Sequence, residues 1–320
     1  MWWPSMARVA RVSKGFGLAK QFQYDTLELP CERGSFCIMR TLSGLFLLVV
    51  TAGASPEVVD RASALYQRTD YANSLQVLAA DPAPDASDYL LSGKNYFMLG
   101  DYKKAIELFE KALRSAPNRS EYELWLGRAW GRRAETGGWL LAGVHASRAR
   151  QCFETAVALD PHNREARNDL FDFYLNAPGF LGGGLEKAAA SAQTIARERP
   201  AEYEFEEAQL ADRAKDYAAA EAHLRRAMEL APSEAGRIVD VARYVAKRGR
   251  LQEADVLFEQ ARKLAPSLPR VAFAEARVNI ENRRNLEQAR RLLEQYLHAS
   301  LTPDDPPREE AEKLLRRAGG

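Results

Sequence analysis

The sequence predicts an all-α fold, a right-handed solenoid of about seven helix–turn–helix repeats followed by a C-terminal capping helix. The first observation is a stripe of a small, a large and a small residue on one helix face. It occurs four times, as Ala105, Phe109, Ala112; Ala149, Phe153, Ala156; Ala220, Leu224, Ala227; and Ala254, Phe258, Ala261. A proline closes each of these units, at Pro117, Pro161, Pro232 and Pro266. Because one amphipathic helix pair cannot bury its apolar faces alone, the repeats are expected to stack.

The clearest repeat runs from Tyr89 to Asn118. Gly93 lies where two helices need a close approach, Gly100-Asp101-Tyr102 forms the turn, and Pro117 ends the second helix. These residues match the pattern of the tetratricopeptide repeat, whose unit has about 34 residues. The chain therefore resembles the tetratricopeptide repeat family, and this resemblance implies a concave face lined by the first helix of each repeat.

Weaker repeats fill the rest of the array. They lie around Tyr71, Ala188 and Ala289, so that the predicted solenoid covers residues 55–299. Atypical first and last repeats are expected, because terminal units present a polar outer face. Residues 300–320 are predicted to be a linker and a capping helix, which begins after a Pro-Pro pair and ends at a glycine.

Two segments are longer than the repeat requires. The first adds an apolar turn around Trp139, and the second places Gly182–Gly184 between two helices. Insertions in a solenoid lie on one edge, often near a binding surface, so both are candidates for partner contacts. The alternative is that Trp139 only covers the core and that the glycines only permit a tight turn. A similar proline–glycine loop is found in exported bacterial tetratricopeptide proteins.

Residues 39–54 have the pattern of a secretory signal peptide. Arg40 follows Met39, an apolar run covers residues 42–50, and small residues at 52–54 fit a signal peptidase. The run is too short to span a bilayer, which takes roughly 20 apolar residues. We therefore expect an exported protein, periplasmic or secreted, that is cleaved near Ala54 and has no integral membrane segment in the mature chain.

Residues 1–38 show no sustained helical or strand period. We interpret them as a doubtful upstream leader, with the true start at Met39; the alternative is a genuine extension in front of a buried apolar segment. Two of the three cysteines lie in this leader, so the mature chain keeps only Cys152, which cannot form an internal disulfide. The net charge of +1 gives no general reason to expect nucleic acid as a partner.

The sequence does not predict an enzyme, a metal site or a cofactor. The four histidines have no metal-ligand spacing, and the segment around Gly182–Gly184 lacks the Gly-Lys-Ser/Thr order of a phosphate loop. Cys152 and His145 are the one combination that resembles a thiol nucleophile and its base. Since Cys152 lies beside Phe153 in a core-forming helix, a buried inert thiol is the expected state.

Binding is the remaining class of function. The predicted exposed positions of the concave face, with the Trp139 loop, form the candidate partner site: Lys94, Phe97, Arg128, Arg132, Trp139, Arg213, Arg243 and Lys247. Several cations in one channel favour an acidic peptide or a terminal carboxylate. The other interpretation is a solvated face that Glu202 and Asp212 partly neutralise. Family members that clamp chaperone C-termini have a lysine four residues before an asparagine, where this chain has Leu90 and Lys94, so that role is not carried over.

The sequence therefore predicts a non-catalytic exported scaffold or adaptor that binds a protein or peptide. The alternative is a small-ligand-binding accessory protein of an envelope transport or lipid system. In that case an apolar pocket would be roofed by Trp130, Trp139 and Phe180.

Overall fold

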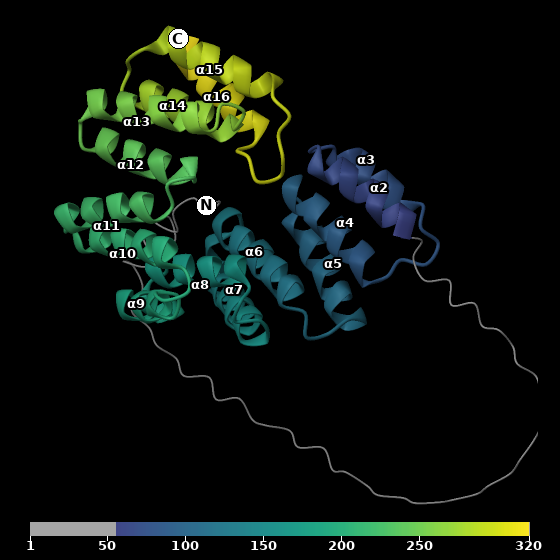
Figure 1. The fold of residues 1–320 in the computed structure, drawn as a ribbon. Coiled ribbons are helices and arrows are strands. Elements are labelled where there is room, and N and C mark those ends of the chain that lie inside the picture. The colour runs from purple at the N-terminus through teal and green to yellow at the C-terminus, as the bar shows by residue number, and fades with distance from the viewer. Residues whose placement is uncertain (1–55, 320) are drawn as a thin grey trace, which may run out of the picture.

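The protein is a solenoid of stacked helix pairs in a computed structural model that describes residues 56–319 (Figure 1). Within this range there are seven helix pairs and one further helix, and no strand. The pairs are α2 (Pro56–Gln67) with α3 (Tyr71–Ala79), α4 (Ala86–Met98) with α5 (Tyr102–Ser115), α6 (Ser120–Thr136) with α7 (Trp139–Leu159), α8 (Arg164–Asn176) with α9 (Leu185–Gln193), α10 (Pro200–Ala214) with α11 (Tyr217–Leu230), α12 (Ala235–Lys247) with α13 (Leu251–Leu264), and α14 (Pro269–Glu281) with α15 (Leu286–His298). The last helix is α16 (Arg308–Gly319). The predicted all-α repeat fold is confirmed.

The turns inside three of the pairs, α2 with α3, α4 with α5 and α10 with α11, follow from a short local motif. A residue with positive φ ends the first helix, and the next residue caps the second helix with its side chain. Gly100 (φ 81°) precedes Asp101, whose carboxylate accepts a hydrogen bond from the backbone N–H of Lys104 at 3.1 Å. Lys215 (φ 65°) and Asp216 repeat this arrangement between α10 and α11. A left-handed residue reverses the chain and an aspartate satisfies a free N–H, so each turn is encoded locally.

The four predicted stripes lie on α5, α7, α11 and α13 and form the centre of four of the helix pairs. Ala105, Phe109 and Ala112 have no exposed surface, and the other stripes are buried in the same way. A carbon atom added at Gly93 on α4 would lie 2.4 Å from the ring of Phe109, and the next pair repeats this contact between Gly127 and Phe153. The aromatic ring therefore occupies the space that the missing side chain leaves between the two helices.

The first long segment lengthens two helices instead of forming a loop. α6 and α7 have 17 and 21 residues, and only Gly137 and Gly138 connect them. Trp139 begins α7, and its side chain lies outside the described part of the structure. The second segment is a turn, as expected: a short 3-10 helix, η2 (Gly179–Leu181), precedes Gly182 (φ 90°) between α8 and α9.

The last helix covers the end of the array. Ala311, Leu314 and Ala318 of α16 are buried in one cluster with residues of α14 and α15, and the hydroxyl of Tyr296 donates a hydrogen bond to the carbonyl of Pro306. Among the described residues, no helix has the length and apolar character needed to cross a bilayer. The predicted leader 1–38 and signal peptide 39–54 lie outside the described range.

We expect the Gly93→Ala substitution to destabilise the fold by about 1–3 kcal/mol, because the new methyl group would overlap the fully buried ring of Phe109. The matched control is Gly236→Ala on α12, where an added carbon has no neighbour within 4 Å. This control should stabilise the protein by about 0.5 kcal/mol through higher helix propensity. Chemical denaturation measures both changes, and equal effects of the two substitutions would contradict the packing argument.

Candidate functional site

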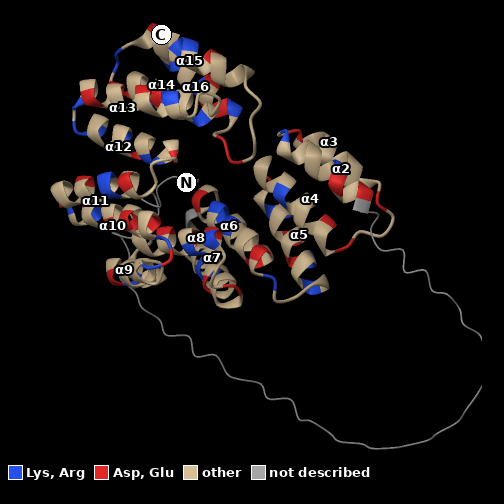
Figure 2. Ribbon diagram, in the orientation of Figure 1, with Lys and Arg blue, Asp and Glu red and all other residues tan. Residues whose placement is uncertain are grey.

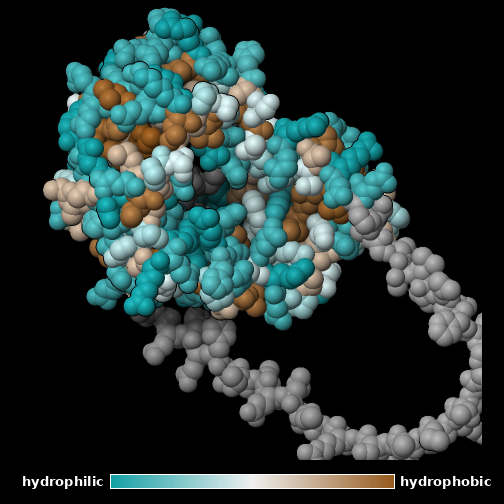
Figure 3. All heavy atoms as spheres, in the orientation of Figure 1, coloured by the Kyte–Doolittle hydropathy of each residue, from teal (hydrophilic) through white to brown (hydrophobic). Residues whose placement is uncertain are grey.

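The first helices of the repeats form the candidate surface. The solenoid curves through an arc, and α4, α6 and α8 lie on its inner side, with α5, α7 and α9 outside them (Figure 1). We call the surface formed by α4, α6, α8, α10, α12 and α14 the inner face. Basic and acidic residues alternate along these helices (Figure 2). The space-filling view shows mainly hydrophilic residues with apolar ones scattered among them (Figure 3).

The predicted cations of the N-terminal half are occupied by contacts within the chain. Lys94 forms an ion pair of 2.6 Å with Glu121 on the next first helix, and Arg128 forms one of 2.5 Å with Asp169 on α8. Arg132 pairs with its neighbour Glu135 at 2.6 Å. All three basic side chains are half-buried. Their charges therefore connect or brace repeats, and they do not form an open basic channel in this half of the described solenoid.

The predicted cations of the C-terminal half are more available. Arg213 donates a hydrogen bond of 3.0 Å to the carbonyl of Leu175. Lys247 is 64 % exposed and lies 3.4 Å from Asp212, which confirms that this carboxylate partly neutralises the face. Arg243 is exposed and has no ion pair with any residue of 56–319. Since Arg243 and Lys247 are one helical turn apart on α12, their side chains share one side of that helix.

The expected exposure of Phe97 is wrong. Its side chain is 9 % exposed, and its ring packs against the rings of Tyr102 at 5.4 Å and Trp125 at 5.5 Å between centroids. Trp125 belongs to α6 of the following repeat, so this repeat covers the side chain of Phe97, which α4 alone would leave exposed. Leu90 and Leu124 on neighbouring first helices are also buried.

The inner face also carries one buried carboxylate and two partly buried ones that the sequence pattern did not single out. Glu206 on α10 is 3 % exposed; burial, and next the charge of Glu202, raise its pKa to about 8. Burial raises the pKa of Asp172 on α8 to about 7 and that of Asp240 on α12 to about 6. The sequence did contain a signal for these carboxylates, because an acidic residue stands in the middle of three consecutive first helices, α8, α10 and α12. No group of side chains suited to a metal ion occurs in residues 56–319.

The thiol and the imidazole considered for catalysis have separate surroundings. Burial, and next the charge of Glu123, raise the pKa of Cys152 far above its usual value, so the thiolate is not available near neutral pH. The ring of His145 packs on Trp130 with 5.2 Å between centroids. Neither group has the environment of an activated nucleophile and its base.

The two long segments expose apolar side chains. Leu140 and Leu141 on the first turn of α7 are 74 % and 53 % exposed, and Phe180 in η2 is 69 % exposed. Trp130 is instead packed against the core, with the guanidinium carbon of Arg148 4.5 Å from its ring centroid. Trp130 and Phe180, the expected roof of a ligand pocket, therefore lie in different environments.

Comparison with known proteins agrees with this architecture. The family model described as tetratricopeptide repeat matches residues 86–119. The crystal structure of a tetratricopeptide repeat protein from Parabacteroides merdae ATCC 43184 is 13 % identical, with a TM-score of 0.54, covering 82 % of this chain and 98 % of that one. A thermophilic repeat protein from Thermus thermophilus is 19 % identical, with a TM-score of 0.48, covering 59 % of this chain and 97 % of the other. No curated protein sequence matches the chain. The predicted resemblance to tetratricopeptide repeat proteins is confirmed.

We expect the Glu206→Gln substitution to stabilise the protein above neutral pH. Because the pKa of Glu206 in the folded state lies above its unfolded value, the folded state binds the proton more tightly, and wild-type stability falls as pH rises toward 8. The variant should gain about 4 kcal/mol at pH 8.5 and less than about 1 kcal/mol at pH 4.5, measured as free energy of unfolding. The control is Glu107→Gln at an exposed position of α5; the same pH-dependent gain there would contradict the assignment to Glu206.

Proposed function

We propose that this chain, a tetratricopeptide repeat protein, is an exported, non-catalytic scaffold that binds a protein or peptide partner through its inner face. The observation that supports this most directly is the pair Arg243 and Lys247 on α12. Both are exposed; Arg243 has no ion pair with any residue of 56–319, and the ion pair of Lys247 with Asp212 is long at 3.4 Å. Two cations one turn apart suit a carboxylate-bearing partner segment, so the proposed partner is acidic.

The exposed apolar side chains of α7 and η2 give the scaffold a second contact region. Large apolar residues are more exposed here than a monomer needs, and Leu140 and Phe180 come from neighbouring repeats. A partner segment on the inner face and an apolar contact at this edge can belong to the same complex. Trp139, at the start of α7, belongs to this proposed region.

Affinity capture tests the inner-face proposal. The immobilised protein is exposed to an envelope extract of its host, and retained proteins are quantified by mass spectrometry. We expect the double substitution Arg243→Glu and Lys247→Glu to reduce the amount of a specific partner at least about tenfold, because each reversal replaces attraction by repulsion. The control is Lys103→Glu with Arg114→Glu on the outer helix α5, which makes the same change in net charge. Equal loss with both variants would contradict a site on α12.

Export is tested by the intact mass of the protein in separated cell fractions. The proposed signal peptide predicts a chain that begins at Ser55 in the periplasmic or secreted fraction. Leu47→Arg should retain the uncleaved chain in the cytosol, because a charge in the apolar run opposes its engagement, while Leu47→Ile should change nothing. A full-length wild-type mass in the cytosol alone would contradict export.

A further inference from the structure

Ion pairs connect successive helices of the inner face, and at three places the cation lies on the earlier helix; between α10 and α12 the order is reversed, since Arg237 pairs with Glu202 and Lys247 with Asp212. Lys94 of α4 pairs with Glu121 of α6, and Arg128 of α6 pairs with Asp169 of α8. At the other end of the solenoid, Arg277 of α14 pairs with Glu310 of α16. In each of these three cases a cation on one first helix meets a carboxylate on the next one. We call this series of contacts the charge ladder.

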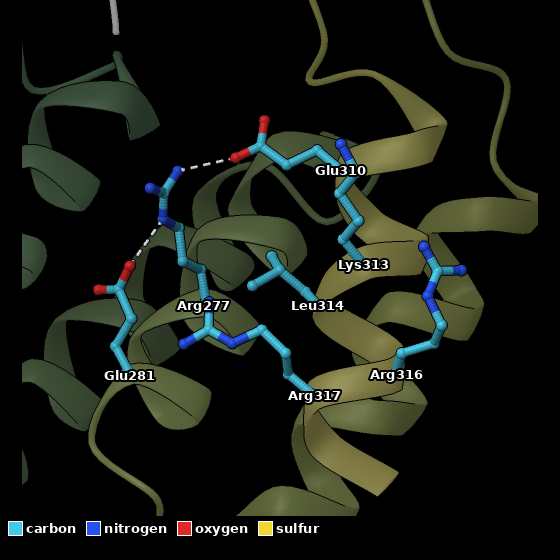
Figure 4. Close-up of a pocket in the computed structure, with 7 residues that line it drawn as sticks. All are labelled: Arg277, Glu281, Glu310, Lys313, Leu314, Arg316 and Arg317. Atoms are coloured by element: carbon cyan, nitrogen blue, oxygen red, sulfur yellow. Dashed lines mark hydrogen bonds and ion pairs between the residues drawn. The ribbon is translucent and has the colours of Figure 1, made fainter. Parts of the chain in front are cut away.

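The capping helix α16 takes the place of an eighth first helix in the charge ladder. Its apolar side packs on α14 and α15, and its Glu310 accepts the hydrogen bond that a following repeat would accept. The guanidinium of Arg277 donates to Glu310 at 3.1 Å and to Glu281 at 2.9 Å, so both carboxylates point toward this one cation (Figure 4). No later helix follows α16 within the described range to continue the ladder.

Three cations remain at this end of the ladder. Lys313, Arg316 and Arg317 follow Glu310 on α16, are exposed, and form no ion pair with any residue of 56–319. Together with Arg277 and its two carboxylates they line a hollow of about 530 Å³ between α14 and α16 (Figure 4). Leu314 lies at the base of the hollow, and its side chain is almost fully buried in the core. Since Arg277 occupies the carboxylates, the hollow has an excess of positive charge.

The position of these cations at a helix C-terminus is not by itself a site, because the helix dipole favours basic residues in any last turn. The cations of α16 differ from the basic residues of other last turns because they also line a hollow. Arg114 also lies in a last turn, on α5, but it does not line this hollow. At α16 three unpaired cations and an apolar side chain share one concave space that borders the inner face.

We propose that the hollow between α14 and α16 binds an acidic, internal segment of a protein partner. The side-chain carboxylates of that segment would continue the charge ladder by pairing with Lys313 and Arg317. The proposed hydrogen bonds from Lys313 and Arg317 to these carboxylates are charge-assisted and therefore stronger than hydrogen bonds between neutral groups. This inference rests on the proposed function, because it identifies a second contact for the partner held at Arg243 and Lys247.

The test uses a defined peptide and the full mature chain. The probe is a fluorescent peptide of four Glu-Glu-Leu units, acetylated and amidated so that only side-chain carboxylates are available, and the matched probe has lysine in place of glutamate. Fluorescence anisotropy at low salt should detect binding of the glutamate probe only. Lys313→Glu with Arg317→Glu should weaken it at least about tenfold, and Lys313→Gln with Arg317→Gln by a smaller factor. The control Lys103→Glu with Arg114→Glu should retain wild-type affinity.

Several outcomes would overturn the proposal. Equal weakening by the α5 control would mean non-specific attraction by total charge. Displacement of the probe by millimolar inorganic phosphate would mean a site for small anions. Sedimentation as an oligomer that Lys313→Glu with Arg317→Glu disperses would mean that a second copy occupies the hollow. Thermal denaturation verifies that the exposed substitutions leave the fold intact.

The result also separates this inference from the proposed function. If Arg243→Glu with Lys247→Glu abolishes partner capture while the peptide does not bind wild type, only the hollow is rejected. If the peptide binds through Lys313 and Arg317 but the α12 variant retains every captured protein, the inner-face proposal fails and the hollow remains.

Discussion

The close approach of the two helices in each pair is the constraint on which the rest of the structure depends. At Gly93 and Gly127 the absence of a side chain leaves room for the ring of Phe109 or Phe153, and alanines on either side keep the helices near each other. The pair then becomes a stiff unit with apolar faces that only the next pair can bury. Stacking follows from this requirement, and it aligns the first helices side by side along the inner face (Figure 1).

That alignment decides what the charges of the inner face do. Parallel neighbours bring a basic side chain of one repeat within reach of a carboxylate of the next, as for Lys94 with Glu121 and Arg128 with Asp169. Half-buried pairs of this kind contribute more to the register between repeats than to net stability, because desolvation offsets much of the Coulomb attraction. The charges of the inner face thus first connect the repeats, and an exposed side chain such as Arg243, which has no ion pair with any residue of 56–319, is available to another molecule.

The sequence predicts the helices, the turns and the core stripes because each is encoded within one repeat. Gly100 and Asp101 specify a turn by their own backbone and side-chain preferences, and the stripe at Phe109 follows helical spacing. The burial of Phe97 and of Glu206 depends on side chains from other repeats, which no single repeat contains. The same reason explains why the sequence did not predict the ion pairs of Lys94 and Arg128: charge can be read from the sequence, but pairing between residues about one repeat apart requires the stacking geometry.

A series of nearest-neighbour contacts must leave its last member incomplete, and the two kinds of contact end differently here. The apolar contacts end cleanly, because Ala311, Leu314 and Ala318 of α16 bury the open side of the last pair. The ionic contacts do not end there, because α16 supplies Glu310 to Arg277 and then presents Lys313 and Arg317 to solvent. A helix evolved only to close the core could carry acidic or neutral residues at these positions without loss of packing. The packing of α16 therefore does not require this positive charge; the helix dipole favours it in the last turn, and it leaves Lys313 and Arg317 available to an acidic partner segment.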